Sequence, residues 1–250
     1  MRARAVRHAA AAAAVTSLAL LLTACGGEEK KTEDTGKADA SASAAAKPDV
    51  KALSAAELDK LVVEQADLKG YQVQKAKAGQ VLNAGDVSAD KAVCEPLAEA
   101  FASAAPGTPG ASAQRKAIEV PDKKTGSVDD ALGALAAPIT SVTLGSYAGE
   151  GAQQVFAALK TAGTDCAGGF TVHGGGTKST VSKLAPETVT AGDEALAWTV
   201  TSKNEGETFV TKLVVFRKGN NLAGFSTLSL GGEVKELPTG IVDAQAAKLR

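Results

Sequence analysis

The sequence predicts an α+β fold, in which an antiparallel β-sheet of about six strands carries three to four helices packed mainly on one face. Two observations lead to this class. Apolar residues recur at helical spacing in four segments, and at every second position in the runs between them. The strand candidates late in the chain follow one another through turns of about two to four residues, and such short connections allow only antiparallel pairing.

Four segments have the spacing and the end signals of helices. Ser54-Ala55-Ala56-Glu57 matches a capping box, and the helix that it opens ends before Gly70. A second helix is expected over 88–104, with Pro96 near its start, and a third over 150–162. The last is expected after Pro238.

Strands are expected where the apolar period becomes two. The run 208–217 is apolar on both faces, which is typical of a central strand. Asn204-Glu205-Gly206 and Gly219-Asn220-Asn221 are hairpin-sized breaks on either side of this run. The segment 105–113, rich in Pro and Gly, is expected to be an exposed loop. The other strand candidates are 139–147, 195–202 and 222–230, with shorter ones at 71–78, 117–121, 170–173 and 177–184.

The first 24 residues are predicted to be a signal peptide. Three arginines precede an uncharged apolar run, 9–22, which is too short to cross a bilayer. The run ends in Leu22-Thr23-Ala24-Cys25-Gly26, which resembles the lipobox of bacterial lipoproteins. That resemblance implies a diacylglyceryl group on the Cys25 thiol and cleavage just before it. The alternative is an ordinary secretory signal, with Cys25 as a structural thiol.

A polar tether and one exported domain are expected after the leader. Residues 25–49 comprise the lipidated cysteine and a segment without large apolar residues, which cannot bury enough surface to fold. At about 5–6 Å × √n, the tether would span about 25 Å. The domain is expected over 50–250, because 51 of the apolar residues in the chain are alanines and the larger ones suffice for one modest core.

Cysteine counting predicts a disulfide. If Cys25 is acylated, Cys94 and Cys166 are left as a pair in an oxidising compartment. The bond would close a loop of about 70 residues, which the chain-entropy model values at roughly 4 kcal/mol. The alternative is a redox-active pair, but redox pairs are typically local Cys-x-x-Cys motifs, and the sequence has none.

The sequence offers little for catalysis or metal binding, so we predict no enzyme, no cofactor and no metal. His173 is the one histidine outside the leader, and it stands beside a glycine run at a strand end. The run at 174–176, followed by Thr177-Lys178-Ser179, superficially resembles a phosphate loop, but a strand pattern follows where a helix is needed. With 27 basic and 28 acidic residues, nothing favours nucleic acid.

Five aromatic residues are the candidates for ligand binding. Four of them stand on three successive strand candidates, and the fifth is on the helix expected to cover those strands. They either form a shared core or line a gap between sheet and helix that an acyl chain or another apolar solute could enter. The five are Trp198, Phe209, Phe216, Phe225 and Phe156.

The order of several motifs resembles that of a known family. The chain has a capped helix ending in Asp67-Leu68-Lys69-Gly70-Tyr71, Cys94 before a helix, a Val142-Thr143-Leu144 strand, a helix running into Asp165-Cys166-Ala167-Gly168, and an Arg217-Lys218-Gly219-Asn220 turn. This order is similar to that of actinobacterial (Streptomyces-like) lipoproteins whose domain resembles the extracellular sensor domain of PknH-type kinases. The resemblance implies an antiparallel sheet, a ligand cleft and no enzymatic activity. The kinase domain usually has two disulfides, whereas this domain has cysteines for one.

Two functions are therefore expected as alternatives. In the first, a membrane-anchored lipoprotein on the outer face of the cytoplasmic membrane binds or senses a small or lipidic ligand, with the hairpin tips near Gly174–Gly176 and Asn220 as contact edges. In the second, the same domain recruits an envelope protein and has no ligand cavity.

Overall fold

The computed structural model describes residues 50–77, 79, 81–120, 136–231 and 233–249, all within one compact unit. The predicted signal peptide, Cys25 and the tether lie outside the described residues. Among the described helices, none has both the length and the apolar character that a bilayer crossing requires.

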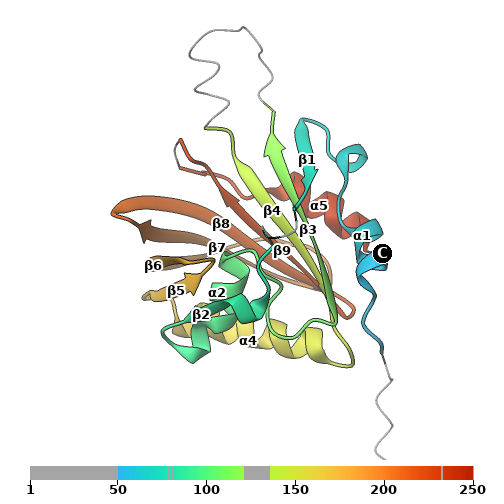
Figure 1. The fold of residues 1–250 in the computed structure, drawn as a ribbon, viewed down its shortest axis with the longest axis horizontal. Coiled ribbons are helices and arrows are strands. Elements are labelled where there is room, and N and C mark those ends of the chain that lie inside the picture. Colours follow the sequence, from blue (N-terminus) through green and yellow to red (C-terminus); the bar gives the residue numbers. More distant parts are fainter. Residues whose placement is uncertain (1–49, 78, 80, 121–135, 232, 250) are drawn as a thin grey trace, which may run out of the picture. The chain divides into compact units, whose positions relative to one another are not determined.

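The described residues form one open antiparallel sheet of nine strands, so the expectation of about six was wrong. Its order is β1-β3-β4-β9-β8-β7-β6-β5-β2, and every neighbouring pair is antiparallel (Figure 1). The short candidates all proved to be separate strands, and a three-residue strand inside the segment expected to be helical added one more. The strands are β1 Tyr71–Lys75, β2 Val87–Ala89, β3 Ala111–Glu119, β4 Ile139–Ser146, β5 Phe170–Gly174, β6 Thr177–Glu187, β7 Glu194–Asn204, β8 Glu207–Lys218 and β9 Asn221–Leu228.

Four α-helices lie in the described part of the chain: α1 Ala55–Leu61, α2 Glu95–Phe101, α4 Gly151–Asp165 and α5 Thr239–Lys248. The predicted capping box of α1 is present, with the Ser54 hydroxyl accepting from Glu57 N–H and the Glu57 carboxylate accepting from Ser54 N–H. The helix expected over 88–104 is confirmed only from Glu95 to Phe101, with Pro96 in its first turn. Strand β2 and a 3₁₀ turn, Ala92–Cys94, replace its first half.

Helices cover both faces of the sheet, so the expectation that they lie mainly on one face was also wrong. In β8, Leu213 and Val215 belong to one apolar core, while Val214 and Phe216 belong to another. Because successive residues of a strand point to opposite faces, the two cores lie on opposite sides of the sheet. A central strand with apolar side chains on both faces is stable only if other elements bury both faces. The two-sided apolar pattern of β8 therefore already predicted helices on both sides of the sheet.

The helices divide into two pairs. Helices α2 and α4 pack on the face that carries Leu213 and Trp198, here called the α2/α4 face. Helices α1 and α5 pack on the other, the α1/α5 face, and Figure 1 shows each pair grouped together. On the α1/α5 face the fully buried Gln245 joins its helix to α1, because its amide donates to Leu61 O (2.9 Å) and accepts from Val63 N–H (3.0 Å).

Candidate functional site

An open groove of about 370 Å³ on the α2/α4 face is the candidate ligand site. We call it the distal groove, because it lies at the Leu228 end of β9. At the other end, Asn220 directly precedes β9 and donates to Lys51, one of the first described residues. Side chains from four adjacent strands form its floor, and the end of α2 with the segment after β9 forms its rim. The lining residues are Phe101, Ala102, Ser103, Ser179, Ser202, Asn204, Phe209, Thr211, Ser226, Leu228 and Leu230.

The groove exists because small hydroxyl residues take positions that are apolar further along the same strands. In β8, Thr211 faces the groove and Leu213, two residues on, is fully buried in the α2/α4 core. In β7, Ser202 likewise lines the groove, and Val200, two residues earlier, is buried in the α2/α4 core. Helix α2 ends at Phe101 on the rim, so it does not continue over these hydroxyls.

The end of α2 is held by three side chains from the sheet. Ser226 Oγ donates to Phe101 O (3.2 Å), while Gln114 Nε2 and Thr143 Oγ1 both donate to Ser103 O (2.6 and 2.7 Å). Ser103 has a φ of 64°, a conformation that is uncommon for residues other than glycine. These donors satisfy carbonyl groups that a helix end leaves without intrahelical partners. They also fix the end of α2, which is part of the rim of the groove, to strands β3, β4 and β9.

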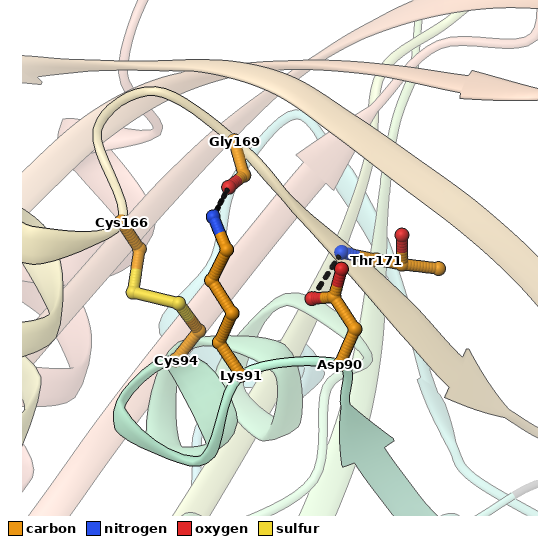
Figure 2. Close-up of a disulfide and its surroundings, with 6 residues drawn as sticks. All are labelled: Asp90, Lys91, Cys94, Cys166, Gly169 and Thr171. Atoms are coloured by element: carbon orange, nitrogen blue, oxygen red, sulfur yellow. Dashed lines mark hydrogen bonds between the residues drawn. A yellow bond between two sulfur atoms is a disulfide. The ribbon is translucent and has the colours of Figure 1, made fainter.

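The start of α2 is held by the predicted disulfide. Cys94 and Cys166 are bonded, with their Cα atoms 5.9 Å apart, and both are fully buried (Figure 2). Cys94 directly precedes α2 and Cys166 directly follows α4, so the bond ties the two helices that cover this face. Helix α2 is therefore fixed at both ends, by a covalent bond at one and by hydrogen bonds at the groove.

The segment before α2 is also attached to β5. Lys91 Nζ donates to Gly169 O (2.8 Å), and Asp90 Oδ1 accepts from Thr171 N–H (2.9 Å), as Figure 2 shows. The Thr171 N–H group is the main cause that lowers the pKa of Asp90 below its usual value. This attachment adds to the disulfide in fixing where α2 begins.

The chemistry of the groove suits an uncharged ligand. None of the described residues that line it is ionisable, and this lining combines hydroxyl groups with apolar carbon. Glu99 of α2 is a buried carboxylate that does not line the groove, and it accepts from Gly107 N–H (2.8 Å). Burial raises the pKa of Glu99, against the opposing effect of that hydrogen bond.

The structure does not bring the five predicted aromatic residues together. Phe209 lines the distal groove, whereas Trp198 is buried in the α2/α4 core. Phe156 of α4 lies in a smaller cluster with Tyr147 and Leu222. Phe216 and Phe225 stack on the opposite face of the sheet, with ring centroids 5.8 Å apart.

Sequence reasoning missed most of the groove. Its apolar rim, Phe101, Leu228 and Leu230, was not among the candidates, nor were the hydroxyl residues of its floor. A signal was present, because Ser202, Thr211 and Ser226 interrupt the alternate apolar positions of three consecutive strands. The cross-strand register that places these three residues diagonally to one another in one groove is a property of the folded sheet.

The two hairpin tips named as contact edges differ in the structure. Gly175 and Gly176, both at positive φ, form the tight turn between β5 and β6, beside an open hollow of about 450 Å³. No helix follows this turn, so it is a hairpin tip and has no helix N-terminus for a phosphate. The Asn220 amide is already engaged, because Nδ2 donates to Tyr147 O (2.8 Å) and Lys51 O (3.2 Å).

One cluster on the α1/α5 face combines a hydroxyl, an ammonium and a carboxylate. Lys212 Nζ bonds Glu187 Oε1 (2.6 Å) and Thr199 Oγ1 (2.8 Å), and Thr199 donates to the same carboxylate. Burial acts to raise the pKa of Glu187, but the hydrogen bonds from Lys212 and Thr199 outweigh it and leave the pKa lowered. None of the three lines the distal groove or the hollow beside the β5–β6 turn, and we assign them a structural role. Among the described residues, no three His, Cys, Asp or Glu side chains form a metal site.

Comparison with solved structures gives a structural likeness, whereas the other two comparisons give no match. No protein-family model matches the chain, and no curated protein does. The structure is similar to the extracellular domain of PknH from Mycobacterium tuberculosis, at 11% sequence identity and a TM-score of 0.45, over 80% of this chain and 95% of that one. At this identity and score, we draw no functional conclusion from the likeness.

Proposed function

We propose that the protein is a non-enzymatic lipoprotein whose exported domain binds a small or lipidic ligand in the distal groove. The observation that carries the proposal is the groove itself, with a floor of hydroxyl groups and a rim of Phe101, Leu228 and Leu230. Ligand sites are typically concave and mainly apolar, with a few polar groups that orient the ligand. The hydroxyls would serve an uncharged polar group, because a charge there would find no opposite charge in the lining.

The membrane anchor is the second part of the proposal. Its support is the order of basic residues, short apolar run and Leu22–Gly26 motif at the start of the sequence. A diacylglyceryl group at Cys25 has two acyl chains, which hold a protein on a bilayer far more firmly than one. The domain would then lie on the outer face of the cytoplasmic membrane, a compartment that also favours the Cys94–Cys166 bond.

The anchor is tested by the mass of the N-terminal peptide of the protein purified from its membrane. We expect a peptide that begins at Cys25 and carries the mass of a diacylglyceryl group. The Cys25→Ser variant should lack both the modification and the cleavage. An unmodified Cys25 in the purified protein, or cleavage at another position, would remove this part of the proposal without affecting the groove.

The groove is tested by titrating the full chain, in mild detergent, with a fluorescent monoacylglycerol analogue, which is uncharged and has hydroxyl groups. Ala102→Phe places a large side chain at the rim, and we expect it to weaken binding at least tenfold. Ala56→Phe is the matched control, because Ala56 is an exposed alanine that lines a different hollow and not the groove. Solvent extraction of the untreated protein, followed by mass spectrometry, identifies what it carries.

Equal binding by the wild type and Ala102→Phe, or no binding by either together with an empty extract, would refute the groove as a ligand site. The second outcome would leave the alternative, recruitment of an envelope protein. One observation favours that alternative, since Leu230 at the rim is 70% exposed. Exposed apolar groups beside a groove also occur where proteins dock.

A further inference from the structure

Among the residues that the structure describes, strand β1 forms one edge of the sheet, with no strand beyond it. The residues of β1 that bond its neighbour β3 are the even-numbered ones, in line with two bonds just beyond its ends. Gly70 O accepts from Val120 N–H, and Ala76 N–H donates to Gln114 O. The N–H and C=O groups of Tyr71, Val73 and Lys75 therefore point away from β3, toward the edge. A row of such groups is a template on which another strand can pair.

The Gln65 side chain occupies this edge. Its Nε2 donates to Tyr71 O (2.8 Å), and its Oε1 accepts from Val73 N–H (2.9 Å). This is the pattern of a parallel sheet. There, one residue donates its N–H to a carbonyl of the neighbouring strand, and its C=O accepts from the N–H two residues further along that strand. The side-chain amide of Gln65 thus takes the place of the N–H and C=O groups of one residue of a tenth strand.

The segment that carries Gln65 is itself held in place. Gln65 begins a 3₁₀ turn, Gln65–Asp67, and the Asp67 carboxylate accepts from Glu64 N–H (2.7 Å) at the start of that turn. The same carboxylate pairs with Lys248 of α5 (2.7 Å), and Leu68 after the turn is buried in the α1/α5 core. Because the turn is bonded to the rest of the domain, the Gln65 amide is presented to β1 at a fixed place.

We propose that Gln65 closes the β1 edge against a second copy of this chain. The pairing that it prevents is antiparallel β1–β1 contact across a two-fold axis at Val73, in which each Val73 bonds its counterpart and Tyr71 bonds the Lys75 of the other copy. Such a contact is self-complementary, so one exposed edge suffices for it. It needs the Val73 N–H group, which Gln65 holds. The opposite edge strand, β2, has only three residues and offers a much shorter template.

The first test compares the masses of variants of the full chain in one mild detergent, by size-exclusion chromatography with light scattering. We expect the protein mass of Gln65→Ala to double as concentration rises, while the wild type stays monomeric. Gln74→Ala is the matched control, since Gln74 is an exposed glutamine of the same strand that makes no bond along the edge. A monomeric, folded Gln65→Ala protein, or a wild type that dimerises equally, would overturn the proposal.

A second variant shows whether the new contact uses the edge. Val73→Pro, added to Gln65→Ala, removes the N–H group on which the pairing depends while leaving the bonds to β3, and edge strands tolerate proline at such positions. We expect the double variant to return to a monomer. Persistent dimers would mean that Gln65→Ala exposes a different surface, and the proposal would fail.

Hydrogen exchange tests the closure in the wild type alone. The Val73 amide should exchange at least tenfold more slowly than the Lys75 amide, which faces the same edge beyond the reach of Gln65. In Gln65→Ala at low concentration, the Val73 amide should lose this protection. Equal exchange of the two amides in the wild type would show that the edge is open in solution, and Gln65 could not then close it.

Discussion

Removal of the disulfide should cost this domain a large part of its stability. The Cys94–Cys166 bond spans 72 residues of sequence. For a loop of this length, the chain-entropy relation gives about 15 cal/mol/K, or about 4.4 kcal/mol at 25 °C, as the effect of the cross-link on the unfolded chain. The double variant Cys94→Ala, Cys166→Ala also loses the packing of two buried sulfur atoms, which adds to the loss. Total stabilities of single domains are typically about 5–15 kcal/mol, so the variant should be close to unfolding.

Urea denaturation followed by the fluorescence of Trp198 measures this loss. Trp198 is the single tryptophan of the chain and is buried in the core that α2 and α4 cover. With a urea slope of about 2 kcal/mol/M, the midpoint should fall by about 2 M. Val93→Ala is the control, because Val93 precedes Cys94 but is exposed, and its midpoint should stay within error of the wild type.

Two results would refute the reasoning. A loss below about 1 kcal/mol in the double variant would mean that the cross-link does not restrain the unfolded chain as the entropy model requires. Two alkyl adducts on Cys94 and Cys166 in the native, non-reduced protein would mean that the bond does not form. Wild-type protein unfolded in the presence of a reductant should lose nearly as much stability as the variant, which separates the effect of the bond from that of the lost sulfur atoms.

Three further changes test other parts of the structure. Ser54→Ala should lower the free energy of unfolding by about 1 kcal/mol in urea, because it removes the capping hydroxyl of α1. Because burial raises the pKa of Glu99 in the folded protein, its charged form destabilises the fold, and this cost appears as pH rises above the unfolded value. Glu99→Gln should therefore be more stable than the wild type at neutral pH, and its advantage should shrink as pH falls below about 4.5; a constant difference across pH would contradict this. Glu187→Leu should lower the free energy of unfolding by about 3 kcal/mol, because it leaves the Lys212 charge without its partner on a side chain that is only 8% exposed. Lys212→Met should cost less, because the Glu187 that it leaves is 29% exposed and can be hydrated. Equal losses in urea would contradict that asymmetry.

Much of the local structure follows from the sequence alone. Side-chain period places β7 and β8 within about two residues of their ends, because alternation along a strand depends only on neighbouring residues. The capping box of α1 is equally local, since its two partners are three residues apart. Counting cysteines identifies the Cys94–Cys166 pair, because exclusion of Cys25 leaves no other combination.

The short elements could not be identified in the same way. Strand β2 has three residues, and the start of β3 at Ala111 lies in a segment rich in Gly and Pro. Each is a strand because a neighbour offers a ladder of hydrogen bonds: β5 for β2, and β4 for β3. Local sequence carries little information on such pairing, so propensity predicts helix or loop there.

What the sequence by itself determined is therefore local: most of the strands, one helix cap and the single disulfide pairing within the domain. What only the tertiary structure decided depends on which strands lie side by side. Register stacks Phe216 on Phe225 and gathers Ser202, Thr211 and Ser226 beneath the end of α2. The 3₁₀ turn after α1 brings Gln65 to the edge of β1. The first two sites join different strands, and no period or spacing along one segment can report the contacts between them. Gln65 is only six and eight residues from its partners, but its contacts depend on how the chain turns between them, which no apolar period reports.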